Sequence, residues 1–160
     1  MHNIVNNITT ITKELSAINS NTKIIAVSKT FNIDFIKPLV DHGHVDFGEN
    51  KVQEAINKWT EIKEKNSRIK LHLIGKLQTN KVKFCLPLFD YIHSLDNLKL
   101  ADKVANEQVK KNFKPKIFIQ VNVGDEAQKS GVILKEFESF YKKITEDFEL
   151  NIIGLMCIPP

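Results

Sequence analysis

The sequence contains few of the residues and patterns that mark several common classes of protein. Its two cysteines, Cys85 and Cys157, lack the spacing of a metal site or a redox motif, so both are expected to be buried, reduced thiols. No apolar run reaches the ~18 residues that a membrane-spanning helix needs. Gly124 lacks the glycine-rich spacing of a dinucleotide-binding loop, and no phosphate-binding loop pattern occurs. The sequence therefore predicts no metal site, no membrane partner and no nucleotide-binding loop.

Charge of one sign is not concentrated anywhere in the chain. Lysine and arginine number 23 against 19 acidic residues, which gives a net charge of +4 and a pI near 9.0. The basic residues between positions 63 and 70 are interleaved with acidic and apolar ones, which is typical of a solvated helix end and loop. We therefore expect no nucleic-acid partner. Residues 1–15 lack a basic region followed by an apolar block and a cleavage site, so a cytosolic location is expected.

Length and composition fit one globular domain over residues 1–160, with 42% hydrophobic and 26% charged residues. Isoleucines and a leucine recur at helical spacing near the start, which predicts an amphipathic helix over residues 3–19. Strand candidates follow at residues 24–29, 45–48, 70–75, 90–95, 116–122 and 151–157. The clearest helical stripes between them lie at residues 52–62, 98–105 and 137–144.

Strict alternation of strand and helix predicts an α/β fold with a parallel sheet and right-handed crossovers. The two candidate architectures are a doubly wound sheet and a (β/α)8 barrel of the TIM type. The pattern contains about six βα units, whereas a closed barrel needs eight and typically ~250 residues.

Lys29 stands at the end of the first strand candidate, in the run IIAVSKTF from Ile24 to Phe31. The apolar residues before it form the short run expected of a parallel strand covered on both faces, and such strands present functional groups at their carboxyl ends. Partial desolvation there would favour the neutral amine and free its lone pair to attack a carbonyl carbon, which favours Schiff-base formation. The alternative is a lysine with a buried stem whose charged head reaches solvent.

Polar residues gather where several other strand candidates end. Glu49 and Asn50 follow the second strand, and His72 lies within the third. Singly, each has an ordinary structural explanation, since Asn50 can belong to a turn that leads into a helix and a histidine between two leucines is often a satisfied core residue. Asp96 and Asn97, before a helical stripe, are typical helix caps.

Taken together, these segments resemble a known family. In order, AVSKT, FGENKVQEA, LHLIGKLQTNK, HSLD, QVN followed by QKSG, and GLMCIPP are similar in sequence and spacing to the pyridoxal phosphate homeostasis proteins, the YggS-like family, from about residue 24 to residue 160. The resemblance implies an alanine racemase-like (β/α)8 barrel of fold type III with one pyridoxal 5'-phosphate (PLP) as cofactor.

The resemblance also implies the site residues. Lys29, in AVSKT, is implied as the residue that holds PLP as a Schiff base, in agreement with the chemistry above. Asn50 and His72 are implied to lie near the cofactor, Lys129 in QKSG to take part in handling it, and Met156 in GLMCIPP to line the barrel mouth.

Members of the family are regarded as carriers or buffers of PLP without robust catalysis, so the expected function is intracellular PLP (vitamin B6) homeostasis. PLP-dependent apoenzymes are the partners that such a carrier would serve. One alternative is a PLP-dependent amino-acid racemase or lyase, but racemisation needs acid–base groups on both faces of the substrate carbon, and neither Tyr91 nor Tyr141 is well placed as the second base. Another is a scaffold or nucleic-acid-binding remnant, which the dispersed charge does not favour.

The family's later motifs, which supply most contacts to the PLP phosphate and an arginine near the pyridine nitrogen, have no counterpart in this sequence, where the one arginine is Arg68. We therefore expect a chain that lacks the C-terminal part of the barrel, with weaker PLP binding. The family is monomeric, but open sheet edges in a partial barrel are expected to allow self-association.

Overall fold

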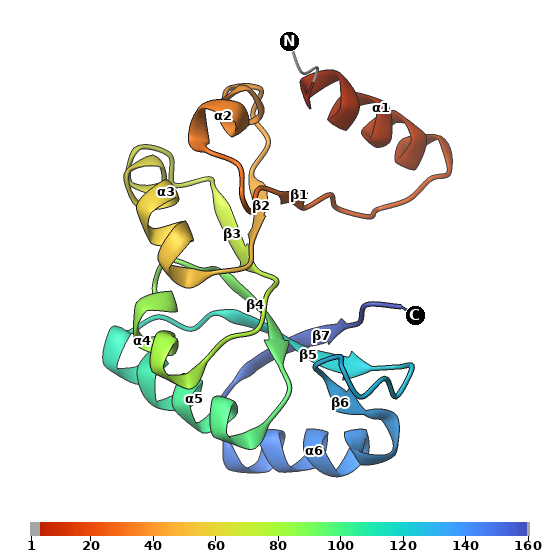
Figure 1. Cartoon of the computed structure of the whole chain (residues 1–160), viewed down its shortest axis with the longest axis vertical. Helices are drawn as coiled ribbons and strands as arrows, with labels where there is room; N and C mark the ends of the chain where they lie inside the picture. Colours follow the sequence, from red (N-terminus) through yellow and green to blue (C-terminus); the bar gives the residue numbers. More distant parts are fainter. Residues whose placement is uncertain (1–3, 160) are drawn as a thin grey trace.

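The computed structural model describes residues 4–159, which fold as alternating strands and helices (Figure 1). The strands are β1 (Ala26–Val27), β2 (Asp46–Glu49), β3 (Lys70–Leu73), β4 (Tyr91–Leu95), β5 (Lys116–Asn122), β6 (Val132–Ile133) and β7 (Asn151–Met156). The helices are α1 (Ile4–Ala17), α2 (Ile33–Asp41), α3 (Val52–Lys65), α4 (Val82–Cys85), α5 (Leu98–Lys111) and α6 (Leu134–Asp147), with a 3-10 turn, η1, at Thr79–Lys81. None of these helices is long and apolar enough to cross a membrane.

The strands form one parallel sheet in which chain order and spatial order agree. β1, β2, β3, β4, β5 and β7 are neighbours in that sequence, and short β6 pairs with the last two residues of β5. Parallel neighbours joined by crossover helices are the pattern of a TIM-type barrel. The predicted alanine racemase-like barrel is thus confirmed in partial form, and β1 and β7 are the sheet edges within the described part of the chain.

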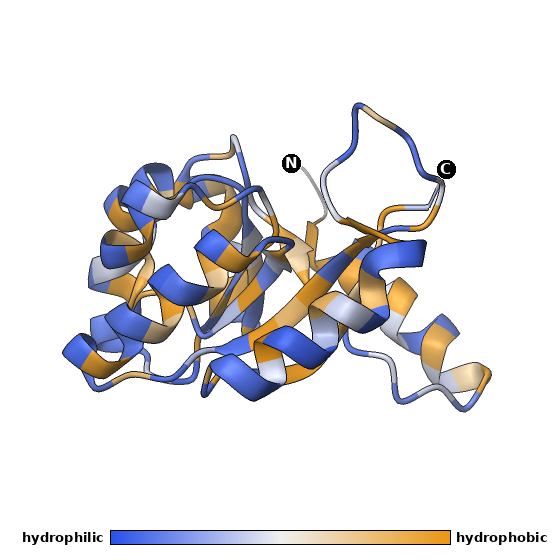
Figure 2. Ribbon diagram, turned by 90° about the horizontal axis from the view of Figure 1, so that it is seen from below, coloured by the Kyte–Doolittle hydropathy of each residue, from blue (hydrophilic) through white to orange (hydrophobic). Residues whose placement is uncertain are grey.

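Helices α3 to α6 follow one side of the sheet and bury its outer face (Figure 1). Trp59 of α3 is fully buried and its ring centroid lies 4.7 Å from that of Phe47 on β2. In Figure 2 the strands are mostly hydrophobic, whereas each helix carries hydrophobic and hydrophilic residues together. The core is therefore built by the apolar helix stripes that the sequence predicted, packed on alternate strand residues.

The opposite face of the sheet is more polar. Strand residues alternate between faces, and Gly48 is paired in register with His72, which is paired with Tyr91. We call this the inner face of the sheet. It carries Asp46, Gly48, His72, Tyr91, His93 and Phe118.

Two expectations for the first strand were wrong. The strand is short, Ala26–Val27 rather than 24–29, and its side chains are not covered on both faces, since Val27 is 48% exposed. The physical reason is that Val27, paired in register with Gly48, points to the face of the sheet opposite helices α3 to α6, and β1 has a strand neighbour on one side only in the described residues. The predicted helix over 3–19 ends at Ala17, and residue 3 lies outside the described residues.

Three smaller features bear on the predictions made from sequence. The cap at Asn97 is confirmed, because its side chain accepts a hydrogen bond from the Leu100 N–H at 2.9 Å. Cys85 is buried as expected, and burial raises the pKa of its thiol, but Cys157 is exposed. β6 was not predicted, because two residues are too few to show a strand pattern.

Candidate functional site

Lys29 lies in an exposed turn at the carboxyl end of β1, between two residues whose backbones are fixed. Ser28 is buried, and its N–H donates to the Gly48 carbonyl at 2.9 Å. Thr30 has a φ of +67°, a left-handed conformation that is uncommon for a residue other than glycine. Lys29 itself is exposed, so the partial burial expected of it is not observed.

A buried carboxylate stands behind this turn. Glu49, the last residue of β2, is fully buried, and its Oε1 accepts three hydrogen bonds. The donors are the Ser28 hydroxyl at 2.7 Å, the Lys58 ammonium at 2.8 Å and the Trp59 indole N–H at 2.9 Å. A charge removed from water needs such partners, so the sequence places a lysine and the tryptophan on consecutive positions of α3.

Asn50 lies directly after Glu49 and forms part of a cavity of about 290 Å³ at the carboxyl ends of β2, β3 and β5. The cavity is lined mainly by polar groups: Asn50, Gly75, Lys76, Gln120, Asn122, Lys129 and Ser130, together with Ile74, Val121 and Ile158. Amide and ammonium donors dominate this lining, and they suit an anionic or carbonyl-bearing ligand.

The close approach of two strand ends shapes this cavity. A Cβ atom built on Gly75 would lie 2.4 Å from the backbone oxygen of Asn50 and 2.8 Å from its Cα. No side chain fits in that gap, so a glycine is required where the loop after β3 passes Asn50.

Lys129 reaches the same cavity from the loop between β5 and β6. Its Nζ lies 2.6 Å from Glu126 Oε1 and donates to the Pro159 carbonyl at 3.2 Å. Asn122 holds this loop, because its side-chain amide donates to the Glu126 carbonyl at 2.9 Å and its Oδ1 accepts from the Glu126 N–H at 3.2 Å. These contacts hold Lys129 near the carboxyl edge of the sheet.

Met156 is the last residue of β7 and is half-buried. It is paired in register with Gln120, whose side chain lines the cavity. Met156 therefore borders the same edge, although it is not among the residues that line the cavity.

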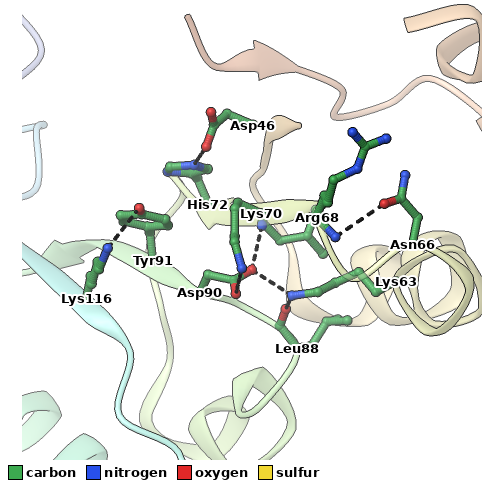
Figure 3. Close-up of polar contacts among 11 residues, drawn as sticks. Asp46, Lys63, Asn66, Arg68, Lys70, His72, Leu88, Asp90, Tyr91 and Lys116 are labelled. Carbon is green, nitrogen blue, oxygen red and sulfur yellow. Dashed lines mark hydrogen bonds and ion pairs between the residues drawn. The ribbon is translucent and has the colours of Figure 1, made fainter. Parts of the chain in front are cut away.

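His72, unlike the other predicted site residues, does not lie at the carboxyl edge of the sheet. Its Nε2–H donates to Asp46 Oδ1 at 3.0 Å, and its ring stacks on Tyr91 with centroids 4.1 Å apart (Figure 3). On its other side, its Nδ1 lies 2.9 Å from His93 Nε2. Asp46 begins β2, so these contacts direct His72 toward the amino ends of the strands. Burial lowers the pKa of His72 against the opposing effect of the Asp46 carboxylate.

His93, in the motif HSLD, and Glu49 lie among the polar strand ends noted in the sequence, but neither they nor the partners of Glu49 were named there as site residues. His93 stacks on Phe118 with ring centroids 4.4 Å apart, and burial lowers its pKa to about 4, with a further contribution from His72. The alternation of β4 was a usable signal, since residues 91 and 93 share a strand face with His72. No comparable signal existed for Lys58, because a lysine within a helix usually faces solvent.

The structure thus brings four of the five predicted residues to the carboxyl edge of the sheet and places the fifth, His72, elsewhere. Asn50 and Lys129 line one cavity, and Met156 borders it through its pairing with Gln120. Lys29 lies at the carboxyl end of the strand that pairs with β2, on the same edge of the sheet. His72 lies deeper on the inner face, engaged with Asp46 and His93.

Comparison with known proteins shows which family this chain resembles. Residues 1–160 match the family model of the alanine racemase N-terminal domain. Proteins named pyridoxal phosphate homeostasis protein are 39% identical over 137 residues in Buchnera aphidicola subsp. Schizaphis graminum and 36% identical over 138 residues in Escherichia coli (strain K12). These matches cover 86% and 85% of this chain but 59% and 58% of the relatives, so the chain spans about 60% of the length of these curated relatives.

Solved structures agree in fold. PipY from Synechococcus elongatus, solved without PLP, has a TM-score of 0.80 at 32% identity, with 92% of this chain and 70% of PipY covered. The structure of PipY with PLP bound has a TM-score of 0.77 at 30% identity, over the same shares of the two chains. Alanine racemase of Clostridium difficile, at 12% identity and a TM-score of 0.67, shares the fold over 86% of this chain and 36% of the racemase. The chain therefore belongs to the pyridoxal phosphate homeostasis protein family and carries the alanine racemase N-terminal domain.

Proposed function

We propose that this chain binds PLP covalently through Lys29 and acts in the cytosol in the homeostasis of that cofactor, without robust catalysis. The observation that carries the proposal is that Lys29, exposed in the turn after β1, lies at the same carboxyl edge of the sheet as the cavity lined by Asn50 and Lys129. A solved relative in this family, PipY, contains bound PLP.

The residues present fit such a ligand. PLP carries an aldehyde and an anionic phosphate, and the cavity is lined by Asn50, Lys76 and Lys129. The side-chain amides of Gln120 and Asn122 also line it, but they donate to the Ser130 and Glu126 carbonyls. Its volume of about 290 Å³ lies near the lower end of the range for small-molecule sites. In Schiff-base formation the amine nitrogen of Lys29 adds to the aldehyde carbon, a C=N bond forms, and one water molecule leaves.

The same geometry favours a carrier over a racemase or lyase. Racemisation needs a second acid–base group across the substrate carbon from the lysine. Tyr91 begins β4 at the amino end of the sheet and stacks on His72, while Tyr141 is exposed on α6. Neither tyrosine lies at the carboxyl edge, and a carrier that releases PLP to apoenzymes needs no such group.

A titration with PLP tests the proposal. We expect a visible absorbance band in the parent chain that saturates with PLP, and its loss in Lys29→Met. Lys23→Met is the matched control, because Lys23 is an exposed lysine just before the same strand. A band of equal intensity in Lys29→Met and the parent would contradict the proposal.

A further inference from the structure

The ion pair between Lys58 and Glu49 is the most deeply buried one in the described part of the chain. The two side chains are 8% and 0% exposed, and the Nζ and Oε1 atoms are 2.8 Å apart. Glu49 Oε2 accepts no hydrogen bond within residues 4–159, so the three donors all converge on Oε1.

Stability alone does not account for such a pair. Removing two charges from water costs several kcal/mol per ion, and replacement of a buried ion pair by packed apolar residues is often neutral or stabilising. An unpartnered buried oxygen adds to that cost. A buried pair retained under these conditions points to a requirement for one fixed local geometry.

The contacts of this pair show which geometry is fixed. Lys58 Nζ also donates to the Ser28 carbonyl at 2.8 Å, and Glu49 accepts from the Ser28 hydroxyl. On the other side of Lys29, the Thr30 N–H donates to Glu54 Oε1 at 2.9 Å, and the same oxygen lies 3.6 Å from Lys58 Nζ. Both backbone neighbours of Lys29 are thus held by one charged cluster.

The backbone conformation of Thr30 also indicates that this turn is held by its contacts. Thr30 is held at a φ of +67°, and strained residues of this kind persist only where the surrounding contacts over-determine them. A relaxed turn would carry the Lys29 Cα with it and change the direction of the amine.

We propose that Lys58, Glu49 and Glu54 are positioning residues for Lys29. This cluster, which we call the turn clamp, fixes Ser28 and Thr30 so that the Lys29 amine meets an incoming aldehyde along one approach. The inference rests on the proposed function for the identity of that aldehyde, but the fixing of the turn is testable without it.

The same helix provides a matched control. Lys63 on α3 donates to the Leu88 carbonyl at 2.8 Å and to Asp90 Oδ2 at 2.6 Å, the same pairing of one backbone carbonyl with one carboxylate (Figure 3). Its partners precede β4 at the amino end of the sheet, away from the turn that carries Lys29. Loss of Lys63 therefore removes a similar but less buried ion pair from the same helix without touching the turn clamp.

The experiment compares Lys58→Met, Lys58→Arg and Lys63→Met in two measurements. The first is amide hydrogen exchange of the segment 28–31 in the absence of PLP. The second is the pH profile for acylation of the Lys29 amine by a small reagent, followed by peptide mass mapping. Where Lys58→Met does not fold, Glu54→Gln carries the same test, because it weakens the acceptor of the Thr30 N–H and removes the ion pair with Lys58 while it leaves the Lys58–Glu49 pair in place.

In Lys58→Met we expect the rate of amide hydrogen exchange in the segment 28–31 to rise about tenfold. We also expect the pH dependence of Lys29 acylation to differ from that of the parent chain. Lys58→Arg should restore most of the parental behaviour, and Lys63→Met should leave both measurements within about twofold of the parent at a similar loss of melting temperature. Equal effects of Lys58→Met and Lys63→Met would overturn the proposal. If the parent chain does not bind PLP but Lys58→Met still exchanges faster in the segment 28–31, the proposed function is refuted and the role of the turn clamp in fixing the turn is not.

Discussion

His72 and His93 form a direct pair on the inner face of the sheet, with Nδ1 of one 2.9 Å from Nε2 of the other. Because the Asp46 carboxylate can only accept, Nε2 of His72 carries the hydrogen, and Nδ1 of neutral His72 then accepts from Nε2–H of His93. Protonation of His72 at Nδ1 would remove the acceptor and break this chain of hydrogen bonds, whereas protonation of His93 would place a positive charge on a buried ring.

The histidine pair predicts a loss of stability in acid. The folded pKa of His93 is about 4 against an ordinary value of 6.5, so its contribution is present above pH 6.5 and is lost as the pH falls toward 4. We expect the free energy of unfolding to fall by about 3 kcal/mol between pH 7 and pH 4 from this group. Urea titrations of the parent and His93→Gln at several pH values measure it. An identical pH slope in the two proteins would contradict the assignment.

Gly75→Ala is expected to damage the cavity edge. The new methyl group would meet the backbone of Asn50 at 2.4 Å, and a backbone atom cannot turn aside as a flexible side chain can. We expect the free energy of unfolding to fall by about 1–3 kcal/mol and PLP binding to weaken.

The control for Gly75→Ala is Gly154→Ala, whose Cβ would meet the Phe118 ring at 3.1 Å. It should change stability by less than about 1 kcal/mol, since a ring can shift by a few tenths of an ångström. Denaturant unfolding and a PLP titration check both variants. Equal effects would contradict the claim that the close approach of Gly75 to the Asn50 backbone requires a glycine.

Trp59→Phe tests the hydrogen bond to the buried Glu49. The substitution keeps an aromatic ring against Phe47 but removes the indole N–H that lies 2.9 Å from Oε1. A lost hydrogen bond to a charged group costs about 1.5–3 kcal/mol. Urea unfolding should be followed by far-UV circular dichroism, because Trp59 is the one tryptophan of the chain. A stability change below about 0.5 kcal/mol would mean that the carboxylate does not depend on this donor.

The exposed apolar edge of β7 predicts concentration-dependent self-association. Leu155 is 58% exposed on an edge strand, and such strands tend to pair with other chains. Leu155→Lys should shift the chain toward monomer in sedimentation velocity experiments. Val109→Lys is the control, because Val109 is 77% exposed on helix α5 rather than on a strand. Equal sedimentation of all three proteins would exclude association through this edge.

The fold was largely predictable because its signals are local and repeated. The amphipathic stripes and short apolar runs of an α/β barrel are visible in the sequence, and the stripe through Ala55 and Trp59 became the buried face of α3. The first strand was mispredicted because exposure depends on strand neighbours rather than on composition. Val27 resembles a core residue in sequence, yet it lies at the sheet edge.

The candidate site was predictable only in part. Motifs identified Asn50 and Lys129, and the structure brings both to one cavity. The role of Lys58 could not be predicted, since its contact with Ser28 joins residues 30 positions apart and depends on how α3 packs. The direction of the His72 ring likewise depends on Asp46 of a neighbouring strand.

The most direct test of the account is to mix the chain with PLP, reduce with borohydride and locate the modified lysine by peptide mass mapping. Reduction turns the C=N bond into a stable amine, so the label records which lysine held the cofactor. We expect a label concentrated at Lys29, with little at the other lysines. Labelling spread over many lysines, or none at Lys29, would contradict the claim that this chain holds PLP at a specific site.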